Sequence, residues 1–372
     1  MTLFKRNIEP HIQKLLFRGK AILIFGPRQA GKTTLAKKII QSYGNDGLYL
    51  NCEIAEVRNA LVLGEPDRLK SLLTNKKIVI LDEAQTVLNI GAILKVFLDT
   101  YSEIQIVATG SSSFDLANKI NEPLTGRAFE FTLYPLSIKE IASSQLDKSG
   151  ALLDYLRTGM YPEVAAEPDR DIKKSILQNI ATNYLYKDVF IFESIRNPLI
   201  FENLIKMLAY QIGNIVSVNE LSNALGISRS VVEKYLRLLE QSYIIKRVNA
   251  FSRNHRNELK KAFKIYFLDL GIRNAVIDSF APVENRDNRG NLFENFVFLE
   301  LMKEYAAETF PPQIFFWRTK TKVEIDFIVY KDENIEAIET KWKENSVSFK
   351  IFLKMYPNAK TRVITTKNFD IL

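Results

Sequence analysis

The hydrophobic positions of the first 140 residues form short runs separated by stretches with helical spacing. In the separating stretches, residues 35–43 and 92–102, apolar side chains recur every three or four positions. Strands that alternate with helices predict a parallel sheet covered on both faces, because a parallel connection needs a crossover segment that packs against the sheet. The predicted strands cover residues 21–25, 47–51, 78–81 and 104–108.

The pattern changes after a polar stretch at residues 143–150. Residues 152–277 are mostly helical in spacing and end in two strand-like runs. A second polar stretch, residues 281–290, precedes a helix, three strands, and a further helix and strand. We therefore predict an α/β fold with three domains, over residues 1–145, 146–280 and 281–372.

The length and composition are those of a packed protein with more than one core. Of the 372 residues, 47% are hydrophobic and 25% are charged. A single cysteine, Cys52, excludes an internal disulfide framework and a multi-thiolate zinc site. Two histidines, His11 and His255, leave little for metal cages or Ser-His chemistry. No apolar run approaches the roughly 18 residues of a membrane span, and the first residues lack a signal-peptide pattern. We expect a cytoplasmic protein that contacts no membrane.

The basic surplus of the chain lies in one segment. The whole sequence has 51 Lys and Arg against 43 Asp and Glu, a formal net charge of +8. Residues 170–264 hold 16 of the basic residues and 8 of the acidic ones, which accounts for the surplus. This segment either meets a polyanion such as nucleic acid or carries a solvated basic face, and charge alone leaves both interpretations open.

A glycine-rich loop joins the first predicted strand to the following helix in the pattern G-x-x-x-x-G-K-[ST]. Glycines let backbone N–H groups surround phosphates at a helix N-terminus, and Lys32 adds a positive charge for the β- and γ-phosphates. The hydroxyl of Thr33 is a ligand for Mg²⁺. We therefore predict ATP and Mg²⁺ as cofactors, with the nucleotide bound by Gly26, Pro27, Arg28, Gln29, Ala30, Gly31, Lys32, Thr33 and Thr34.

Residues for hydrolysis are predicted further along the chain. Asp82 and Glu83 end the strand at 78–81, where the first can hold Mg²⁺ and the second can orient water; the alternative is a solvated strand end. Thr109 or Ser111, after the strand at 104–108, can sense the γ-phosphate or belong to an ordinary Gly/Ser turn. Arg127 is a candidate for reaching a γ-phosphate in its own or an adjacent subunit, and equally for a surface salt bridge.

These motifs resemble those of the AAA-type ATPases of bacteria and archaea that carry the C-terminal domain DUF4143. The resemblance rests on GPRQAGKTT, VILDEAQ, ATGSSSF, LTGR and YPLSIKE in this order, then on GMYPEV, YLYKDV and the C-terminal third. It implies a P-loop sheet with an extra strand between the phosphate-binding and acidic motifs, a water-positioning Glu83, and a sensor in the turn from Thr109 to Ser111. It does not establish Arg127 as a finger between subunits.

Residues 218–239 have the spacing of a helix-turn-helix. A glycine turn and the N-cap Ser228 separate two predicted helices, and the strand-like runs that follow fit a wing with the basic loop 252–261 at its tip. Such a winged helix either reads DNA with its second helix or serves as a packing and hinge element. The nucleic-acid candidates on the outer side of the second helix are Arg229, Ser230, Lys234 and Arg237.

Three carboxylates and a lysine mark the last predicted domain. Glu294 lies in a helical stretch, Asp326 lies in the strand-like run 324–330, and Glu339 and Lys341 are two positions apart on the next strand. Alternate strand positions share a face, so Glu339 and Lys341 point the same way. Apolar neighbours predict that Asp326 and Glu339 face inward, where a cation or Lys341 must compensate their charge.

This set resembles the restriction-endonuclease-like core of the PD-(D/E)xK class, to which DUF4143 proteins are similar in this region. The resemblance implies that Asp326 and Glu339 hold Mg²⁺, that Lys341 stabilises the charged phosphate or positions water, and that Glu294 supports the metal shell. The proline of the nominal motif is absent here. The alternative is a retained fold in which Asp326 and Lys341 form a structural ion pair.

We predict from these motifs an ATP-hydrolysing protein that couples ATP to DNA binding and, as a further step, to metal-dependent DNA cleavage. The alternative is an ATP-dependent switch or scaffold that binds a protein partner or a second copy of the chain and carries a silent nuclease-like domain. Duplex binding with a steep salt dependence favours the first hypothesis, and tight ATP binding without nucleic-acid affinity favours the second.

Overall fold

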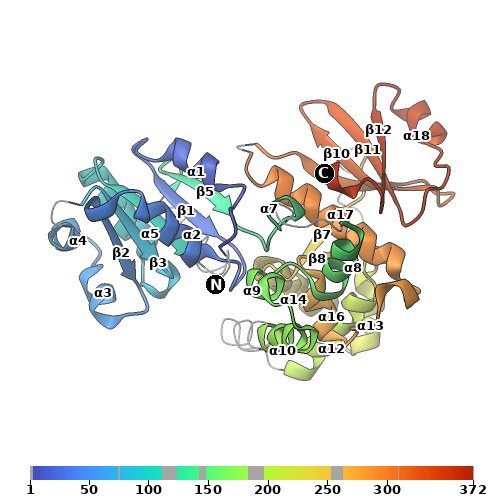
Figure 1. The fold of residues 1–372 in the computed structure, drawn as a ribbon, viewed down its shortest axis with the longest axis horizontal. Coiled ribbons are helices and arrows are strands. Elements are labelled where there is room, and N and C mark those ends of the chain that lie inside the picture. Colours follow the sequence, from blue (N-terminus) through green and yellow to red (C-terminus); the bar gives the residue numbers. More distant parts are fainter. Residues whose placement is uncertain are drawn as a thin grey trace. The chain divides into compact units, whose positions relative to one another are not determined.

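The computed structural model describes residues 3–73, 76–110, 124–141, 148–182, 197–252, 263–308 and 310–371 (Figure 1). Its contacts divide the chain into two compact units. One comprises Thr2–Leu136 with the short segment Gln241–Tyr243, and the other comprises Ser137–Glu240 and Ile244–Leu372. The division into three domains stays a prediction.

The N-terminal unit is built on a parallel five-stranded sheet. Its strands are β1 (Ala21–Phe25), β2 (Gly47–Asn51), β3 (Ile78–Asp82), β4 (Gln105–Gly110) and β5 (Ala128–Thr132). They follow the order β2-β3-β4-β1-β5, and all neighbours are parallel. The strand β4 lies between β1 and β3, which is the extra strand that the family resemblance implies. The hydrophobic pattern did not predict β5, because only one of its five residues is buried.

Helices cover the central strands of this sheet. The helices of the unit are α1 (Glu9–Leu15), α2 (Lys32–Gln41), α3 (Ala55–Ala60), α4 (Pro66–Leu72) and α5 (Ile90–Thr100). Every residue of β1, β3 and β4 is buried. Leu23 and Val79 pack with Phe97 of α5 in one hydrophobic cluster, while α2 contacts β2, β3 and β4. Burial on both faces explains why these strands are continuously apolar rather than alternating.

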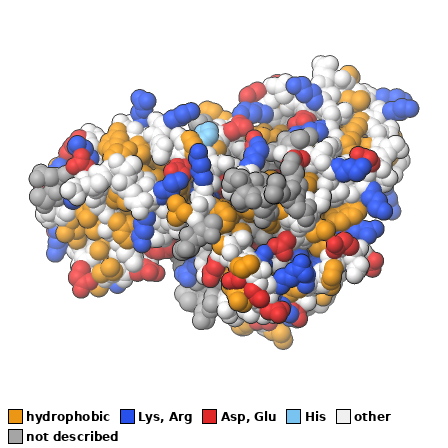
Figure 2. Space-filling view, viewed as in Figure 1, with side chains coloured by type: hydrophobic (Ala, Val, Ile, Leu, Met, Phe, Trp, Pro, Cys, Tyr) orange, Lys and Arg blue, Asp and Glu red, His pale blue; other side chains and the backbone are white. Residues whose placement is uncertain are grey.

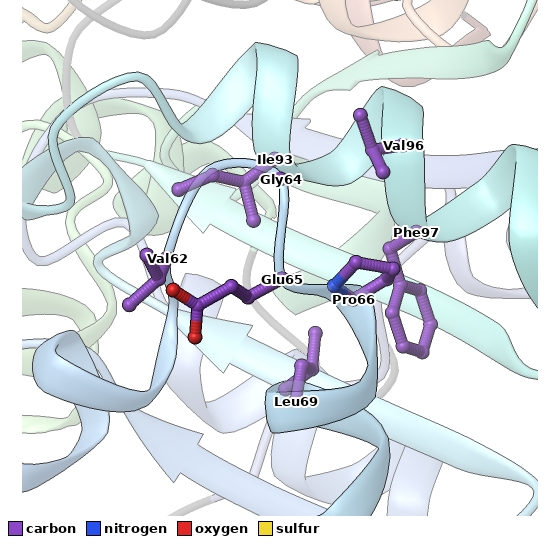
Figure 3. A pocket seen from close by; sticks show the side chains of 8 residues that line it. All are labelled: Val62, Gly64, Glu65, Pro66, Leu69, Ile93, Val96 and Phe97. Atoms are coloured by element: carbon purple, nitrogen blue, oxygen red, sulfur yellow. The ribbon is translucent and has the colours of Figure 1, made fainter.

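A small pocket lies between α4, α5 and the loop that precedes α4 (Figure 3). The side chain of Glu65 points toward Val62, and Pro66 lies beside Phe97. Glu65 is the one charged residue of the lining, and no predicted site residue takes part in it. The lining residues are Val62, Gly64, Glu65, Pro66, Leu69, Ile93, Val96 and Phe97.

The middle of the chain is mostly helical. Its helices are α7 (Ile138–Ile141), α8 (Lys148–Thr158), α9 (Pro162–Ala166), α10 (Arg170–Ala181), α12 (Pro198–Tyr210), α13 (Val218–Leu225), α14 (Arg229–Gln241) and α16 (Leu270–Val276). An antiparallel sheet in the order β6-β8-β7 accompanies them, formed by β6 (Ile215–Val216), β7 (Ile245–Asn249) and β8 (Phe263–Phe267). The YLYKDV motif lies outside the described residues. The predicted wing tip at residues 252–261 also lies outside them, apart from Ser252.

One motif of the family resemblance has a clear structural role in this region. The turn at Gly159 and Met160, which begins GMYPEV, lies against the N-cap of α16. The carboxylate of Asp269 accepts from the backbone N–H of Ile272 at 3.0 Å and from that of Met160 at 2.8 Å. Gly159 has φ +70°, and a Cβ there would lie 2.1 Å from the same carboxylate. Glycine is therefore required for both conformation and space.

The C-terminal region is a four-stranded mixed sheet with a long helix. It comprises α17 (Arg289–Tyr305), β9 (Gln313–Arg318), β10 (Glu324–Lys331), β11 (Asn334–Lys341), α18 (Lys350–Met355) and β12 (Lys360–Thr365). The strand order is β12-β11-β10-β9, with β12 parallel to β11 and the other pairs antiparallel. Phe251 donates its backbone N–H to the carbonyl of Phe316 at 2.6 Å, so the segment after β7 adjoins β9. Within the described residues, no helix is both long and apolar enough to cross a bilayer.

Candidate functional site

The predicted phosphate loop lies between β1 and α2, at the carboxyl edge of the parallel sheet. Gly26 has φ +146°, and a Cβ there would lie 2.2 Å from the carbonyl oxygen of Leu133. Gly31 has φ +96° and is the N-cap of α2, with no side chain capping the helix. The first N–H groups of α2 therefore remain available as donors to an anion.

Lys32 is almost fully buried within this loop. Its Nζ donates to the carbonyl oxygens of Gly26 at 3.0 Å and Pro27 at 2.8 Å. Burial lowers the pKa of Lys32 to about 8, against the opposing charges of Glu83 and Asp82. The side chain is thus mainly an ammonium at neutral pH and becomes neutral under mildly alkaline conditions.

The carboxylate of Asp82, at the end of β3, is buried and held by three hydroxyl groups. Thr33 Oγ1 donates to it at 3.1 Å from Oδ1 and 2.8 Å from Oδ2. Thr109 Oγ1 donates to Oδ1, and the phenol of Tyr49 donates to Oδ2. The structure therefore brings together the predicted residues Thr33, Asp82 and Thr109.

Glu83 follows Asp82 in a left-handed backbone conformation, with φ 53°. Its backbone N–H donates to Thr109 Oγ1 at 3.1 Å, and its carboxylate accepts from the side-chain amide of Gln85. A non-glycine residue with positive φ is uncommon, so the surrounding contacts must stabilise this conformation. The hydroxyl of Thr109 thus connects the two neighbouring carboxylate residues at the strand end.

The remaining predicted residues of this site are placed as follows. Ala30 is buried, whereas Arg28, Gln29 and Thr34 are exposed on the loop and the start of α2. Ser111 lies outside the described residues. Arg127 precedes β5 at the amino edge of the sheet, where its carbonyl accepts from the N–H of Ala21, and its guanidinium pairs with Asp99 at 2.8 Å. This placement, opposite to the phosphate loop, favours the salt-bridge interpretation of Arg127.

Sequence reasoning missed two side chains of this site. Arg6 donates from Nη1 to the carbonyl of Ala30 at 2.7 Å and from Nη2 to that of Tyr134, and so ties the phosphate loop to the end of β5. Tyr49 lies on β2 and reaches Asp82 across the sheet. Both partners are distant in the sequence, so no local pattern indicates either contact.

The donor set fits a nucleotide with a divalent cation. The uncapped helix N–H groups and the ammonium of Lys32 suit an anion. Among the described residues, the buried carboxylate of Asp82 meets three hydroxyl groups and forms no ion pair. Such oxygen ligands suit the hard cation Mg²⁺.

The predicted nucleic-acid residues share one side of α14. Arg229, Ser230, Lys234 and Arg237 are all exposed, while Val232 and Leu236 are buried. Two glutamates of the same helix, Glu233 and Glu240, are paired with Arg247 of β7 at 2.8 and 2.7 Å. On the face that Figure 2 shows, basic and acidic side chains are interspersed, so net charge does not single out a surface there.

The predicted strand carboxylates of the C-terminal region are half-buried neighbours. Phe327 pairs with Ile338 across β10 and β11, which brings Asp326 beside Glu339. Asp326 Oδ2 accepts from the backbone N–H and the hydroxyl of Thr340, each at 2.7 Å. Lys341 Nζ lies 2.6 Å from Glu339 Oε1. The lysine thus pairs with Glu339, and not with Asp326 as the ion-pair alternative expected.

Glu294 has partners that differ from the expected ones. Its Oε1 accepts from Lys264 Nζ at 2.9 Å and from the phenol of Tyr266, both on β8. Lys264 is 1% exposed and also contacts Glu324 Oε1 at 2.6 Å. Sequence reasoning missed Lys264, because it belongs to the preceding predicted domain and 30 residues separate it from Glu294.

The charges of this cluster act on one another. Burial and the charge of Asp326 raise the pKa of Glu294 to about 7, and they also raise the pKa of Glu339. Although burial opposes it, the carboxylates of Glu294, Asp326 and Glu324 raise the pKa of Lys264. Within the described residues, no three or more Asp, Glu, His or Cys side chains are grouped to hold a metal ion. Glu294 is thus an ion-pair partner of Lys264 on β8, and its expected role in a metal shell stays a prediction.

Three domain families match the chain. Residues 18–142 match an AAA domain, residues 149–282 match the domain of unknown function DUF8612, and residues 289–371 match the domain of unknown function DUF4143. The matches cover most of the chain in sequence order.

Relatives from archaea and bacteria match along nearly the whole chain. An uncharacterized protein of Methanocaldococcus jannaschii is 29% identical over 373 residues, covering 95% of this chain and 81% of its own. One from Haemophilus influenzae is 27% identical over 372 residues, covering 94% and 89%. One from Mycobacterium tuberculosis is 26% identical over 333 residues, covering 88% and 72%.

Similarity to solved structures is weak. The Pif1 helicase from Candida albicans is 15% identical over 48% of each chain, with a TM-score of 0.27. Drosophila ORC bound to AT-rich DNA and Cdc6 is 12% identical over 73% of this chain and 89% of that chain, with a TM-score of 0.26. Neither similarity carries an argument about this protein.

Proposed function

We propose that the N-terminal unit, which matches an AAA domain, binds and hydrolyses ATP with Mg²⁺. The AAA and DUF4143 matches agree with the resemblance of the motifs. One observation carries the proposal: Thr33 Oγ1 and Asp82 Oδ2 meet at 2.8 Å beside the buried Lys32. Hydroxyl, carboxylate and ammonium groups then lie together at the uncapped start of a helix. This combination suits the phosphates and cation of a nucleotide.

Each side chain has a distinct role in this proposal. Lys32 and the N–H groups of α2 bind the phosphates, and Thr33 and Asp82 hold Mg²⁺, which when bound neutralises charge on the β- and γ-phosphates. Glu83 orients the attacking water. Thr109 fixes the positions of Asp82 and Glu83 relative to each other, because its hydroxyl donates to the Asp82 carboxylate and accepts from the Glu83 N–H.

Two substitutions separate binding from hydrolysis. Lys32→Ala should lose most nucleotide affinity, because it removes the cation of the phosphate loop. Glu83→Gln should bind ATP as the parent does and hydrolyse it about 100-fold more slowly, since only the water-orienting carboxylate is lost. Fluorescent-nucleotide titration and phosphate release measure the two effects. Equal turnover by Glu83→Gln and the parent would remove Glu83 from the mechanism.

We also propose that α14 contacts nucleic acid, with DNA as the first candidate. The supporting observations are the exposed Arg229, Lys234 and Arg237 on one side of the helix, and the pairing of its two glutamates with Arg247. The helix follows α13 after a turn in which Gly226 has φ +65°. This geometry is typical of helix-turn-helix modules, in which the second helix meets DNA.

Salt dependence tests this contact. Neutralising Arg229, Lys234 and Arg237 together should weaken duplex binding and lower the log-log salt slope by up to about one unit per lost phosphate contact. ATP hydrolysis without DNA should not change. The matched control replaces Lys331, Lys343 and Lys354, which lie outside the middle region. Unchanged affinity and slope in the α14 variant would identify the helix as a packing element and favour a protein-binding switch.

Metal-dependent cleavage by Asp326, Glu339 and Lys341 is a second candidate function. The observation that favours it is the adjacency of the two carboxylates, with Lys341 2.6 Å from one of them. Plasmid incubated with Mg²⁺ or Mn²⁺, with and without ATP, provides the test. Cleavage by the parent should be lost in Asp326→Ala while ATP hydrolysis remains. A parent protein that cuts with neither metal would leave this region as a binding module.

A further inference from the structure

Tyr49 occupies a position in the sheet from which it can act on the acidic strand end. It lies on β2 with Ile80 as its register partner on β3, and Asn51 is the partner of Asp82. Tyr49 and Asn51 share a face because they are two residues apart. The phenol extends along that face and donates to Asp82 Oδ2.

The hydroxyl groups hold Asp82 from two sides of β3. Thr109 comes from β4 and donates to Oδ1, whereas Tyr49 comes from β2 and donates to Oδ2. Thr33 bridges both oxygens from the start of α2. A carboxylate that accepts hydrogen bonds at both oxygens cannot rotate freely about its Cβ–Cγ bond, so its lone pairs keep fixed directions.

The surroundings of Tyr49 keep its phenol suited to this task. Tyr49 is half-buried on β2, and its phenol donates to Asp82 Oδ2. The ammonium of Lys37 lies 4.7 Å from the centre of the ring, at cation–π distance. The ring is thereby held from the α2 side while the hydroxyl reaches β3.

We propose that Tyr49 is a positioning residue for the metal-binding carboxylate: it fixes Asp82 Oδ2 in the orientation in which Asp82 holds Mg²⁺. The inference rests on the proposed ATP site and adds β2 to the strands that build it. If Tyr49 only supports the fold, its loss should lower the melting temperature. If it positions Asp82, its loss should raise the Mg²⁺ concentration needed for nucleotide binding.

The test compares Tyr49→Phe with the parent and with Tyr101→Phe. Tyr101 belongs to the same unit and its phenol also donates to an aspartate, Asp67, so the control loses the same kind of bond elsewhere. Binding of a fluorescent ATP analogue is titrated with Mg²⁺, and binding in EDTA and the melting temperature are measured alongside.

In Tyr49→Phe we expect the Mg²⁺ concentration for half-maximal effect to rise about tenfold, as loss of a hydrogen bond to a charged group would cause. Binding in EDTA should match the parent, and Tyr101→Phe should match it throughout. An unchanged Mg²⁺ requirement in Tyr49→Phe, with a Mg²⁺-dependent parent, overturns the role of Tyr49 alone. A parent without Mg²⁺-dependent nucleotide binding overturns both this role and the proposed ATP site.

Discussion

Two acidic clusters in this chain are held by different kinds of donors. Asp82 accepts hydrogen bonds from the hydroxyls of Thr33, Tyr49 and Thr109. In the C-terminal region, Glu294 and Glu339 are instead paired with the ammonium groups of Lys264 and Lys341. Hydroxyl groups orient a carboxylate without cancelling its charge, whereas an ammonium group cancels it.

The difference bears on what each cluster can bind. Asp82 is only 3% exposed, and within the described residues no lysine or arginine forms an ion pair with it. The charge of Lys32 acts on it from nearby, but burying the carboxylate remains costly. A bound divalent cation would remove that cost, so the N-terminal cluster is suited to recruit one. Lys264 already supplies a positive charge between Glu294 and Glu324, so this part of the C-terminal cluster has less need of a metal.

The largest expected effect follows from removing the internal cation. Above pH 7, where Glu294 is ionised, Lys264→Ala leaves its carboxylate buried without its ammonium, which should lower the free energy of unfolding by about 3 to 5 kcal/mol. The protein has two tryptophans, and both Trp317 and Trp342 belong to the C-terminal region, so their fluorescence in urea reports on this part.

Lys331→Ala is the matched control for this prediction. Lys331 pairs with Glu308, but its side chain is 39% exposed, so its loss should cost less than about 1 kcal/mol. Equal unfolding midpoints for Lys264→Ala and Lys331→Ala would show that the buried lysine is not needed to balance the cluster.

The next effect is a pH dependence that belongs to Glu294. Its pKa is raised from 4.5 to about 7, so the folded state binds its proton more tightly than the unfolded state does. The stability from this group is therefore complete below pH 4.5 and is lost as pH rises through 7, a change of about 3 kcal/mol. Glu294→Gln should flatten this part of the profile in tryptophan-monitored unfolding.

A charge variant sharpens the assignment. Asp326→Asn removes the charge that, together with burial, raises the pKa of Glu294, so the loss of stability should move to lower pH. If the profiles of the parent, Glu294→Gln and Asp326→Asn coincide, another group causes the pH dependence.

A smaller effect is expected at Asp82, whose hydrogen-bond donors are hydroxyl groups and not ammonium groups. Thr109→Val removes one hydroxyl from Asp82 and from the N–H of Glu83, which should lower ATP turnover about tenfold. Thr109→Ser keeps the hydroxyl and should remain near the parent. Phosphate release at saturating ATP measures both. Loss of turnover in Thr109→Ser as large as in Thr109→Val would assign the role of this residue to packing.

The smallest effect concerns Arg127. Its guanidinium pairs with Asp99 on the surface at the amino edge of the sheet. Arg127→Ala should therefore leave ATP turnover unchanged in dilute and in concentrated protein solutions. If Arg127→Ala lowers ATP turnover only at protein concentrations where copies of the chain associate, Arg127 contacts the nucleotide of an adjacent subunit.

Local motifs made much of the fold and the arrangement of the candidate nucleotide site predictable. The phosphate loop is contiguous, and its chemistry follows from the residues between a strand and a helix. Asp82 and Thr109 are each predicted by the end of a buried strand, since carboxyl ends of parallel strands meet at one edge. The helix-turn-helix pattern likewise depends on residues close in sequence. The strand β5 was not predicted, because only one of its five residues is buried and its hydrophobic pattern is therefore weak.

Contacts between distant residues were decided by the tertiary structure alone. Tyr49 reaches Asp82 over 33 residues, and Arg6 reaches Tyr134 over 128. Lys264 takes Glu294 as its partner, and Lys341 takes Glu339 and not Asp326. Composition and spacing specify which charges a chain carries and which strand face they occupy. The partner of a buried charge depends on which strands and helices pack together, because compensation acts over a few ångströms in space whatever the separation in sequence.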